Sequence, residues 1–342
     1  VAAVANVDKT FTVGFGEDEK YNEIGYAKEF SKYINKENFS KVISPEEYWN
    51  SLSKIQYHMD EPLADPAAVA LFFVCQIASE KVKAVLSGEG ADEIFGGYNI
   101  YHNPADMASY FKIPRPIRKA VGAVAEKLPH KHGINYLIRG SKDLDERFIG
   151  NAYIFSEKER KDILCIKTNA PDAMAITKPF YDKVRDQDQV TQMQYIDLHL
   201  WMTGDILLKA DKMSMAHSLE LRVPFLDRKV MELAEQIPVK DRVTETETKY
   251  AMRLAALQAC PPQTAKKKKL GFPVPVRAWL RDEQYAGVVR KAFNTPAAEQ
   301  FFRTKELNAM LDQHISGKRD NWRQIWCIFM FLVWYDEYFV KR

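Results

Sequence analysis

The sequence predicts an α/β fold, a parallel sheet with flanking helices, followed by a mostly helical extension. In residues 1–98, short apolar segments alternate with segments of helical periodicity, which is typical of a parallel sheet covered by helices. Beyond about residue 103 the strand signals stop and helical periodicity continues. A serine–glycine turn follows an apolar strand, at the edge where parallel sheets hold their ligands. We therefore divide the chain into an α/β part, residues 1–102, and a helical extension, residues 103–342.

The predicted elements of the α/β part follow one another in a regular order. Residues 1–7 (VAAVANV) are typical of the end of a helix, and residues 10–15 (TFTVGF) alternate as a strand does. Apolar side chains at helical spacing predict a helix over residues 19–35, and residues 40–44 (SKVIS) predict a second strand. Pro45 suits the first position of the next helix, where its missing N–H costs nothing.

The rest of the α/β part leads to the serine–glycine turn. Residues 60–66 (DEPLADP) are rich in turn-forming residues, and residues 67–80 are a strongly apolar helical segment. Residues 83–86 form a compact strand that ends at Ser87 and Gly88. A further helix is expected directly after this turn.

The extension consists of helical segments that proline and glycine separate. The last segment carries the run IWCIFMFLVWY at residues 325–335. This run is too short to span a bilayer, which takes about 20 residues, so we expect a core helix. The other expected helical segments are residues 116–128, 144–163, 178–217, 227–236, 248–258 and 283–315.

The composition is that of a folded chain with a large core. Of 342 residues, 46% are hydrophobic and 28% are charged, which excludes a disordered or collagen-like chain. Lys and Arg total 49 against 46 Asp and Glu, so the charge gives no reason to expect nucleic acid or an anionic membrane as a partner. The four cysteines form no CxxC pair, and we expect reduced thiols rather than a disulfide framework or a zinc site.

The turn at residues 87–93 (SGEGADE) carries most of the chemistry in the sequence. Gly88 and Gly90 let a backbone approach a ligand closely because neither has a Cβ atom. The free N–H groups of the helix that follows favour an anionic group. Glu89, Asp92 and Glu93 suit a divalent cation or a general base, but carboxylates at a helix start are also common as simple caps. Taken alone, these residues leave a nucleotide or metal site and a capped turn as equal alternatives.

The segment LSGEGADEIFGGY, residues 86–98, closely resembles the signature of the ATP-dependent synthetase domain of glutamine-hydrolysing asparagine synthetases. Residues 60–66, residues 210–227 (ADKMSMAHSLELRVPFLD) and residues 268–280 (KKLGFPVPVRAWL) resemble further family segments. The resemblance therefore extends over nearly the whole chain. It implies a pyrophosphatase-type fold of the adenine-nucleotide α-hydrolase group, in which residues 1–102 are the nucleotide-binding part.

The resemblance also implies a reaction, its cofactors and its partners. The side-chain carboxylate of aspartate attacks the α-phosphate of ATP, with Mg²⁺ as cofactor, to give β-aspartyl-AMP and pyrophosphate. Ammonia then attacks this acyl-adenylate, and asparagine and AMP leave. In the family the ammonia comes from glutamine, through a glutaminase domain of the same polypeptide. A cytoplasmic enzyme, with a homodimer as its assembly and no membrane or nucleic-acid partner, is the corresponding expectation.

The resemblance assigns roles to individual residues. Glu89 matches the carboxylate implicated in forming the intermediate and in taking the ammonia proton. Asp92 matches a Mg²⁺ ligand. Lys249 matches a lysine that clamps phosphate and the oxyanion, although a helix-surface lysine is ordinarily just solvated. The expected ATP-binding residues are Val13, Leu86, Ser87, Gly88, Gly90 and Asp92.

Other residues carry less specific expectations. Asp211 and Arg222 are expected as substrate-binding or supporting residues, and Arg222 pairs with a carboxylate either of the protein, which we prefer, or of the substrate. Glu93 and His217 are expected to be structural. Lys266–Lys269 is either a solvated run or part of a lid over the phosphates.

Two parts of a complete family member have no counterpart in this sequence. One is the glutaminase domain with its N-terminal cysteine nucleophile. The other is the first strand with the pyrophosphate loop of the Ser-Gly-Gly-x-Asp-Ser type, which would lie just before residue 1. We expect the chain alone neither to hydrolyse glutamine nor to adenylate aspartate efficiently.

Three alternatives to asparagine formation stay open. A β-lactam-type synthetase uses the same adenylation, but that subfamily generally has a tyrosine where this sequence has Glu89. A related amidotransferase acts on another carboxylate. In the third alternative, the chain is an inactive or truncated version of the fold that serves as a scaffold.

Overall fold

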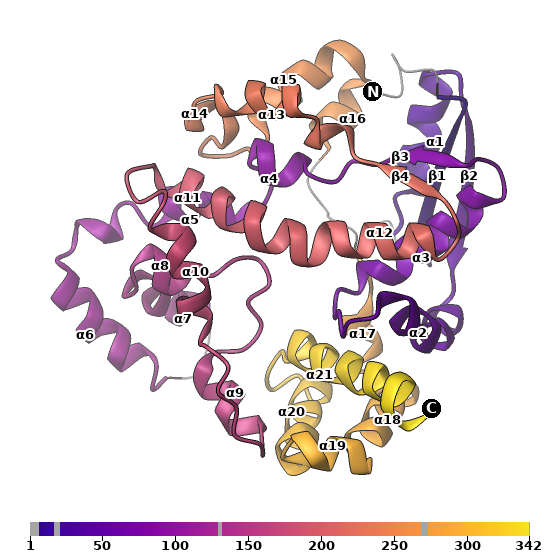
Figure 1. Cartoon of the computed structure of the whole chain (residues 1–342). Helices are drawn as coiled ribbons and strands as arrows, with labels where there is room; N and C mark the ends of the chain where they lie inside the picture. The colour runs from indigo at the N-terminus through magenta and orange to yellow at the C-terminus, as the bar shows by residue number, and fades with distance from the viewer. Residues whose placement is uncertain (1–6, 17–20, 129–131, 268–272, 342) are drawn as a thin grey trace.

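The computed structural model describes residues 7–16, 21–128, 132–267 and 273–341 (Figure 1). Within these ranges, short strands are embedded in a largely helical chain, so the mixed α/β class is confirmed. The helix end expected at residues 1–7 falls almost wholly on residues 1–6, outside the described part of the chain.

The first sheet consists of β1 (Lys9–Phe15) and β2 (Glu37–Ile43), which pair in parallel along their whole length. Lys9 lies opposite Glu37, and Phe15 lies opposite Ile43. β1 contains the strand predicted at residues 10–15, whereas β2 contains residues 40–43 of the strand predicted at 40–44, because Ser44 caps the helix that follows.

The helix between these strands, α1 (Ile24–Tyr33), begins later than predicted. The side-chain amide of Asn22 accepts from the backbone N–H of Ile24 at 3.0 Å and donates to the carbonyl of Gly16 at 2.7 Å. A side chain that bonds to the local backbone in this way competes with a helical turn. Residues 21–23 therefore stay outside the helix, and residues 17–20 lie outside the described part of the chain.

The second sheet corrects the sequence prediction that strands stop after residue 103. β3 (Ala84–Leu86) pairs in parallel with β4 (Glu220–Arg222), with Leu86 opposite Arg222. The residues of β4, ELR, lack the apolar run that marks β3 (AVL). This pairing crosses the division at residue 102, so the extension contributes a strand to the sheet structure.

The described strands form two two-stranded parallel sheets rather than the single sheet that the sequence predicted. Their helical cover follows the prediction more closely. α2 (Pro45–Met59) begins at Pro45, and Ser44 and Glu47 form a capping box in which the Ser44 hydroxyl accepts from the Glu47 N–H at 3.1 Å. α3 (Ala67–Ser79) packs against β1 and β2 and is the most apolar helix of the α/β part.

The C-terminal helix, α21 (Trp322–Tyr335), is a core helix, as the sequence predicted. Trp326 is 1% exposed and packs 6.0 Å, centroid to centroid, from Tyr48 of α2. Val13 and Phe15 of β1 belong to the same hydrophobic core, and α21 reaches it by packing against α2 (Figure 1). None of the helices in the described ranges is long and apolar enough to cross a membrane.

A long helical rod crosses the middle of the molecule (Figure 1). It runs through α11 (Gln189–Ile196), a π-helical stretch (Asp197–Ile206) and α12 (Leu207–Met215) without a break. π-Helical turns widen a helix and occur often at functional sites. The rod packs against α3 at one end and supplies the chain that leads into β4.

The remaining helical segments lie along the chain before and after this rod. They are α4 (Ala91–Phe95), α5 (Asn103–Asp106), α6 (Arg115–Ala125), α7 (His132–Gly140), α8 (Leu144–Arg147), α9 (Glu157–Ile163), α10 (Ala173–Tyr181), α13 (Arg228–Glu235), α14 (Val239–Arg242), α15 (Tyr250–Ala259), α16 (Pro262–Lys266), α17 (Val276–Trp279), α18 (Glu283–Phe293), α19 (Pro296–Phe301) and α20 (Thr304–Ile315), with short 3₁₀ turns at Asn99–His102, Tyr110–Lys112 and Pro224–Leu226 and a π turn at Asp336–Val340.

Candidate active site

The turn after β3 is built on the pairing of β3 with β4. Leu86 lies opposite Arg222, and the N–H of Ser87 donates to the Arg222 carbonyl at 2.8 Å. The hydroxyl of Ser87 donates to the carboxylate of Glu89. A Cβ at Gly88 would meet no described atom within 4 Å, so there is room beside the backbone here. The predicted residues of this turn are thus held together at the carboxyl end of β3.

Gly90 joins the turn to α4 and has two reasons to be glycine. Its φ of 91° lies in the left-handed region, which side chains rarely adopt. A Cβ at Gly90 would also lie 2.5 Å from Cδ2 of Leu226. Leu226 belongs to residues 210–227, so two of the segments that carry the family resemblance are in contact with each other.

Asp92 and Lys249 form an ion pair that the sequence did not predict. The Nζ atom of Lys249 lies 2.9 Å from Oδ1 of Asp92, and the two side chains are only 17% and 16% exposed. Lys249 precedes α15 and has a φ of 53°, which is unfavourable for a residue with a side chain. Its N–H donates to the carbonyl of Gly96 at 3.2 Å. The structure therefore brings the side chain of Lys249 into contact with α4, the short helix that follows Glu89.

Gly97 lies directly against this ion pair. A Cβ at Gly97 would be 2.0 Å from Oδ1 of Asp92 and 2.2 Å from Cε of Lys249. The N–H of Gly97 also donates to the Asp92 carbonyl at 2.6 Å. In the sequence Gly97 is visible only as part of the segment at residues 86–98, because its packing role depends on Lys249, which is far away in the sequence.

Glu93 has the surroundings of a structural residue, as the sequence predicted. It is 1% exposed, and the hydroxyl of Tyr98 donates to its Oε1 at 2.5 Å. Burial, and then the charge of Glu93, raise the pKa of Tyr98 well above its usual value. The indole N–H of Trp201 donates to Tyr98 Oη at 3.1 Å, and the Gln194 amide donates to the Glu93 carbonyl at 2.6 Å. This network fixes α4 against the central rod.

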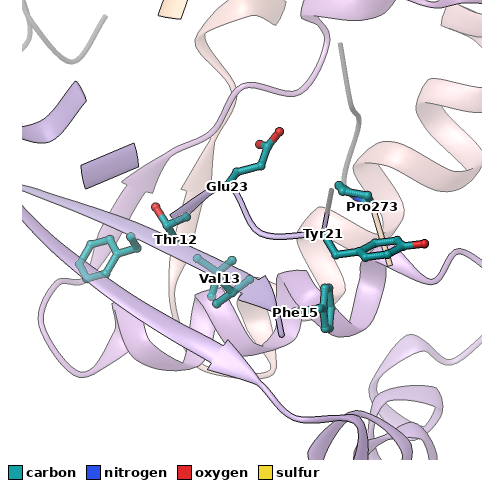
Figure 2. A pocket seen from close by; sticks show the side chains of 8 residues that line it. Thr12, Val13, Phe15, Tyr21, Glu23 and Pro273 are labelled. Carbon is teal, nitrogen blue, oxygen red and sulfur yellow. The ribbon is translucent and has the colours of Figure 1, made fainter. Parts of the chain in front are cut away.

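Val13 lies apart from the turn, in the wall of a cavity of about 100 Å³. Figure 2 shows Val13 and Phe15 of β1 around the same space as Tyr21, with Pro273 beside the ring of Tyr21. The side chain of Val13 is 5% exposed, so this residue is both a core residue and a cavity residue. Both interpretations of Val13 from the sequence remain compatible with its position.

The other predicted residues lie in different surroundings. Arg222 is exposed, and its Nε donates to Glu220 at 2.9 Å, so it pairs with a carboxylate of the protein. Asp211 is exposed on α12. His217 packs against the ring of Phe72 at 4.4 Å, and burial lowers its pKa, as suits a structural histidine. Of Lys266–Lys269, residues 268 and 269 lie outside the described part of the chain, as do residues 270–272, so the lid remains a prediction.

A buried charge cluster, which the sequence did not predict, lies around Lys209 of α12. Nζ of Lys209, on α12, lies 2.5 Å from Asp65 Oδ2 and 2.6 Å from Asp205 Oδ1. The charge of Lys209 helps to lower the pKa of Asp65 despite its burial, whereas burial and the neighbouring Asp65 raise the pKa of Asp205 to about 7. The cluster ties the loop at residues 60–66 to the rod. Asp205 and Lys209 stand four residues apart in a helical segment, a spacing that signals such a pair.

Comparisons of the sequence with known proteins identify the family of the chain. The sequence model described as asparagine synthase matches residues 1–336. The chain belongs to the asparagine synthase family. It is 43% identical over 335 residues to asparagine synthetase [glutamine-hydrolyzing] 1 of Bacillus subtilis (strain 168), covering 98% of this chain and 53% of that protein. A relative from Mycobacterium tuberculosis (strain ATCC 25618 / H37Rv), also described as an asparagine synthetase, is 42% identical over 332 residues, covering 95% of this chain and 50% of that protein.

The extent of these matches matters for function. The chain spans about half the length of the curated relatives that it matches. In the part of the chain that the structure describes, no three His, Cys, Asp or Glu side chains are grouped closely enough to hold a metal ion by themselves.

Proposed function

We propose that this chain carries the ATP-dependent part of an asparagine-forming reaction, in which aspartate is activated by ATP and then amidated by ammonia. The observation that carries the proposal is the position of Glu89 on the turn after β3, with Lys249 paired to Asp92 of the helix that follows. Membership of the asparagine synthase family supports the same chemistry.

The proposed chemistry gives each of these residues a distinct task. An oxygen of the aspartate side chain attacks the α-phosphorus of ATP, forms a C–O–P bond and releases pyrophosphate. Ammonia adds to the carbonyl carbon of this acyl-adenylate and loses a proton, and AMP leaves as asparagine forms. Glu89 accepts the proton, and the ammonium group of Lys249 stabilises negative charge on phosphate and on the oxyanion. When phosphate binds, it replaces Asp92 as the ion-pair partner of Lys249.

The donor set at the turn fits Mg²⁺ held largely by ATP. Mg²⁺ is usually bound through one or two carboxylates together with substrate phosphates. Asp92 would supply the carboxylate, and the ion, when bound, supplies charge neutralisation at the phosphate oxygens. Asp92 would then contact the ion instead of Lys249, and Lys249 would contact phosphate instead of Asp92.

The nucleotide contacts are proposed along the two sheets. We assign them to Leu86, Ser87, Gly88 and Gly90 at the turn and to Val13 in the cavity wall. The cavity, at about 100 Å³, is smaller than the roughly 300–1,000 Å³ of typical ligand sites, so it is proposed to take only part of the nucleotide. Asp211 and Arg222 are proposed as supporting residues.

The wider architecture is part of the same proposal. We propose the pyrophosphatase-type α-hydrolase fold, with residues 1–102 as the nucleotide-binding part and residues 103–342 as its helical extension. Because the relatives are about twice as long, a glutaminase domain is proposed as the source of ammonia. The resemblance also underlies the proposal of a cytoplasmic homodimer.

The test is aspartate-dependent exchange of pyrophosphate into ATP, measured in this chain fused behind the unmatched half of the Bacillus subtilis relative. Glu89→Gln is expected to lower the rate of asparagine formation with ammonium at least about 10²-fold, as loss of a general base does. Glu80→Gln is the matched control, because Glu80 is exposed at the end of α3. Exchange that is independent of aspartate, or equal loss in both variants, would contradict the proposal.

A β-lactam-type reaction is the second candidate, and Glu89 argues against it because that subfamily generally has a tyrosine there. Product analysis with aspartate and ammonium distinguishes free asparagine from a ring-closed product. A scaffold without nucleotide chemistry predicts no heat of ATP binding in calorimetry, with or without Mg²⁺.

A further inference from the structure

Arg253, on the first turns of α15, lies beside Lys249 but was not singled out by the sequence. Its Nε donates to the carbonyl of Thr248 at 2.8 Å. Its Nη1 donates to the carbonyls of Lys267 at 2.7 Å and Ala265 at 3.2 Å, at the end of α16. A planar guanidinium can serve several carbonyls in fixed directions, which a lysine ammonium cannot do in the same way.

The contact with Thr248 bears directly on the backbone of Lys249. The carbonyl of Thr248 and the N–H of Lys249 belong to one peptide group. Arg253 binds that carbonyl, and the Gly96 carbonyl binds that N–H at 3.2 Å. With both polar groups held, the peptide plane has little freedom to rotate, and its orientation sets φ of Lys249. Strained backbone of this kind persists only where the surroundings fix it.

Through Nη1, Arg253 is also connected to the wall of the cavity, by way of Lys267. Lys267, whose carbonyl Arg253 binds, forms an ion pair with Glu23 and lies 4.9 Å from the ring centroid of Tyr26. Glu23 lines the cavity that also contains Val13. Arg253 therefore connects the segment before Lys249 with the segment that borders this cavity.

We propose that Arg253 is a positioning residue, which holds Lys249 in its left-handed backbone conformation and so aims its ammonium group at the phosphates. The proposal rests on the proposed function for its consequence in catalysis, but its structural part does not. Without Arg253, the peptide before Lys249 relaxes and the lysine moves away from α4.

The first experiment needs no activity. Labelling of lysine amines with an acylating reagent, followed by mass spectrometry, reports the accessibility of Lys249, which is 17% exposed in the pair with Asp92. Arg253→Gln is expected to raise the labelling rate of Lys249 several-fold relative to exposed lysines. Arg253→Lys is expected to raise the labelling rate of Lys249 as well, because lysine keeps the positive charge but lacks the planar guanidinium that binds several carbonyls. This second variant replaces Arg253→Gln in the experiment if the glutamine variant does not fold.

Arg303→Gln is the matched control. Arg303 also binds two carbonyls at the end of a helix, those of Lys161 and Asp162, both at 2.7 Å. It lies in a different part of the fold, so its loss tests general destabilisation. Unchanged labelling of Lys249 in the Arg253 variants, or an equal increase in Arg303→Gln, would overturn the proposal.

The second experiment measures aspartate-dependent exchange in the fusion protein. Arg253→Gln is expected to lower kcat by up to about 10²-fold with little change in KM for ATP, the cost of a small misplacement of a catalytic group. In a Lys249→Ala background, Arg253→Gln is expected to cause no further loss of kcat. Independent losses in the double variant would overturn the positioning role. If the wild-type fusion shows no exchange at all, the proposed function fails and the labelling result still decides the role of Arg253.

Discussion

Replacing Gly97 with alanine tests how tightly the Asp92–Lys249 pair is packed. The new Cβ would lie 2.0 Å from Asp92 Oδ1, and ordinary contact begins at 3.4 Å, so the carboxylate has to move by about 1.4 Å, the difference between these distances. The Cε atom of Lys249, at 2.2 Å, has to move by a similar amount. The backbone of Gly97 is not in the left-handed region, so the effect is steric rather than conformational.

The size of the effect follows from which atoms are in the way. Overpacking in a well-packed region costs about 1–3 kcal/mol. One of the atoms in contact is Cα of Asp92, at 2.8 Å, and a backbone atom cannot swing aside as a side chain can. We therefore expect Gly97→Ala to lower the free energy of unfolding by about 2–3 kcal/mol, in the upper part of that range.

Urea unfolding followed by circular dichroism measures this change. Gly287→Ala is the matched control, because Gly287 lies in the middle of α18 and a Cβ there would meet no described atom within 4 Å. The control is expected to be stabilised by about 0.5–1 kcal/mol through helix propensity. The cost of Gly97→Ala is expected to be smaller in a Lys249→Ala background, where the Cε contact is gone. A Gly97→Ala variant as stable as the wild type would refute the reasoning.

Two further predictions concern buried charges. Lys209→Met leaves the carboxylates of Asp65 and Asp205 facing each other in a buried site, so we expect the free energy of unfolding to fall by about 3–5 kcal/mol. The loss is expected to be larger at pH 8 than at pH 5, because both carboxyl groups must ionise at the higher pH. A variant as stable as the wild type at pH 8 in urea unfolding would contradict this. Burial raises the pKa of Asp197 to about 7, against the effect of the hydrogen bonds that it accepts from Tyr101 and Asn151. The native state therefore keeps a proton that the unfolded chain loses near pH 4, and the stability from this group falls by roughly 4 kcal/mol as the pH rises from about 4 to about 7. Asp197→Asn is expected to lack this fall, whereas parallel stability curves for the two proteins would count against it.

Local patterns predicted the parts of the fold that depend on neighbouring residues. The strand at β1 shows alternation over enough residues to be visible, and Pro45 marks the start of α2. α3 and α21 are apolar enough to be recognised as buried helices. β4 escaped because its residues, ELR, lack the apolar run that marks β3 (AVL), and because its partner, β3, is distant in the sequence.

In the candidate site, too, the sequence predicted the residues that are contiguous and missed the contacts between distant segments. The residues of the turn after β3 were predicted because they are contiguous and resemble a known signature. The pairing of Lys249 with Asp92, the packing of Gly97 and the link through Arg253 depend on which distant segments meet, and no periodicity encodes that. Asp205 and Lys209 are the exception, since their helical spacing was visible in the sequence but their burial was not.

The pairing of β3 with β4 has a consequence for how the chain is made. The turn that bears Glu89 rests on Arg222, and the helix after it pairs with Lys249, so its shape depends on residues synthesised much later. At roughly 5–20 residues per second, the ribosome takes on the order of ten seconds to pass from the first of these segments to the last. During that interval the emerging chain already displays an apolar helix, α3, and an unpaired β3. Chaperone binding during synthesis is therefore expected to concentrate on residues 67–86, and to end when residues 220–249 have left the ribosome.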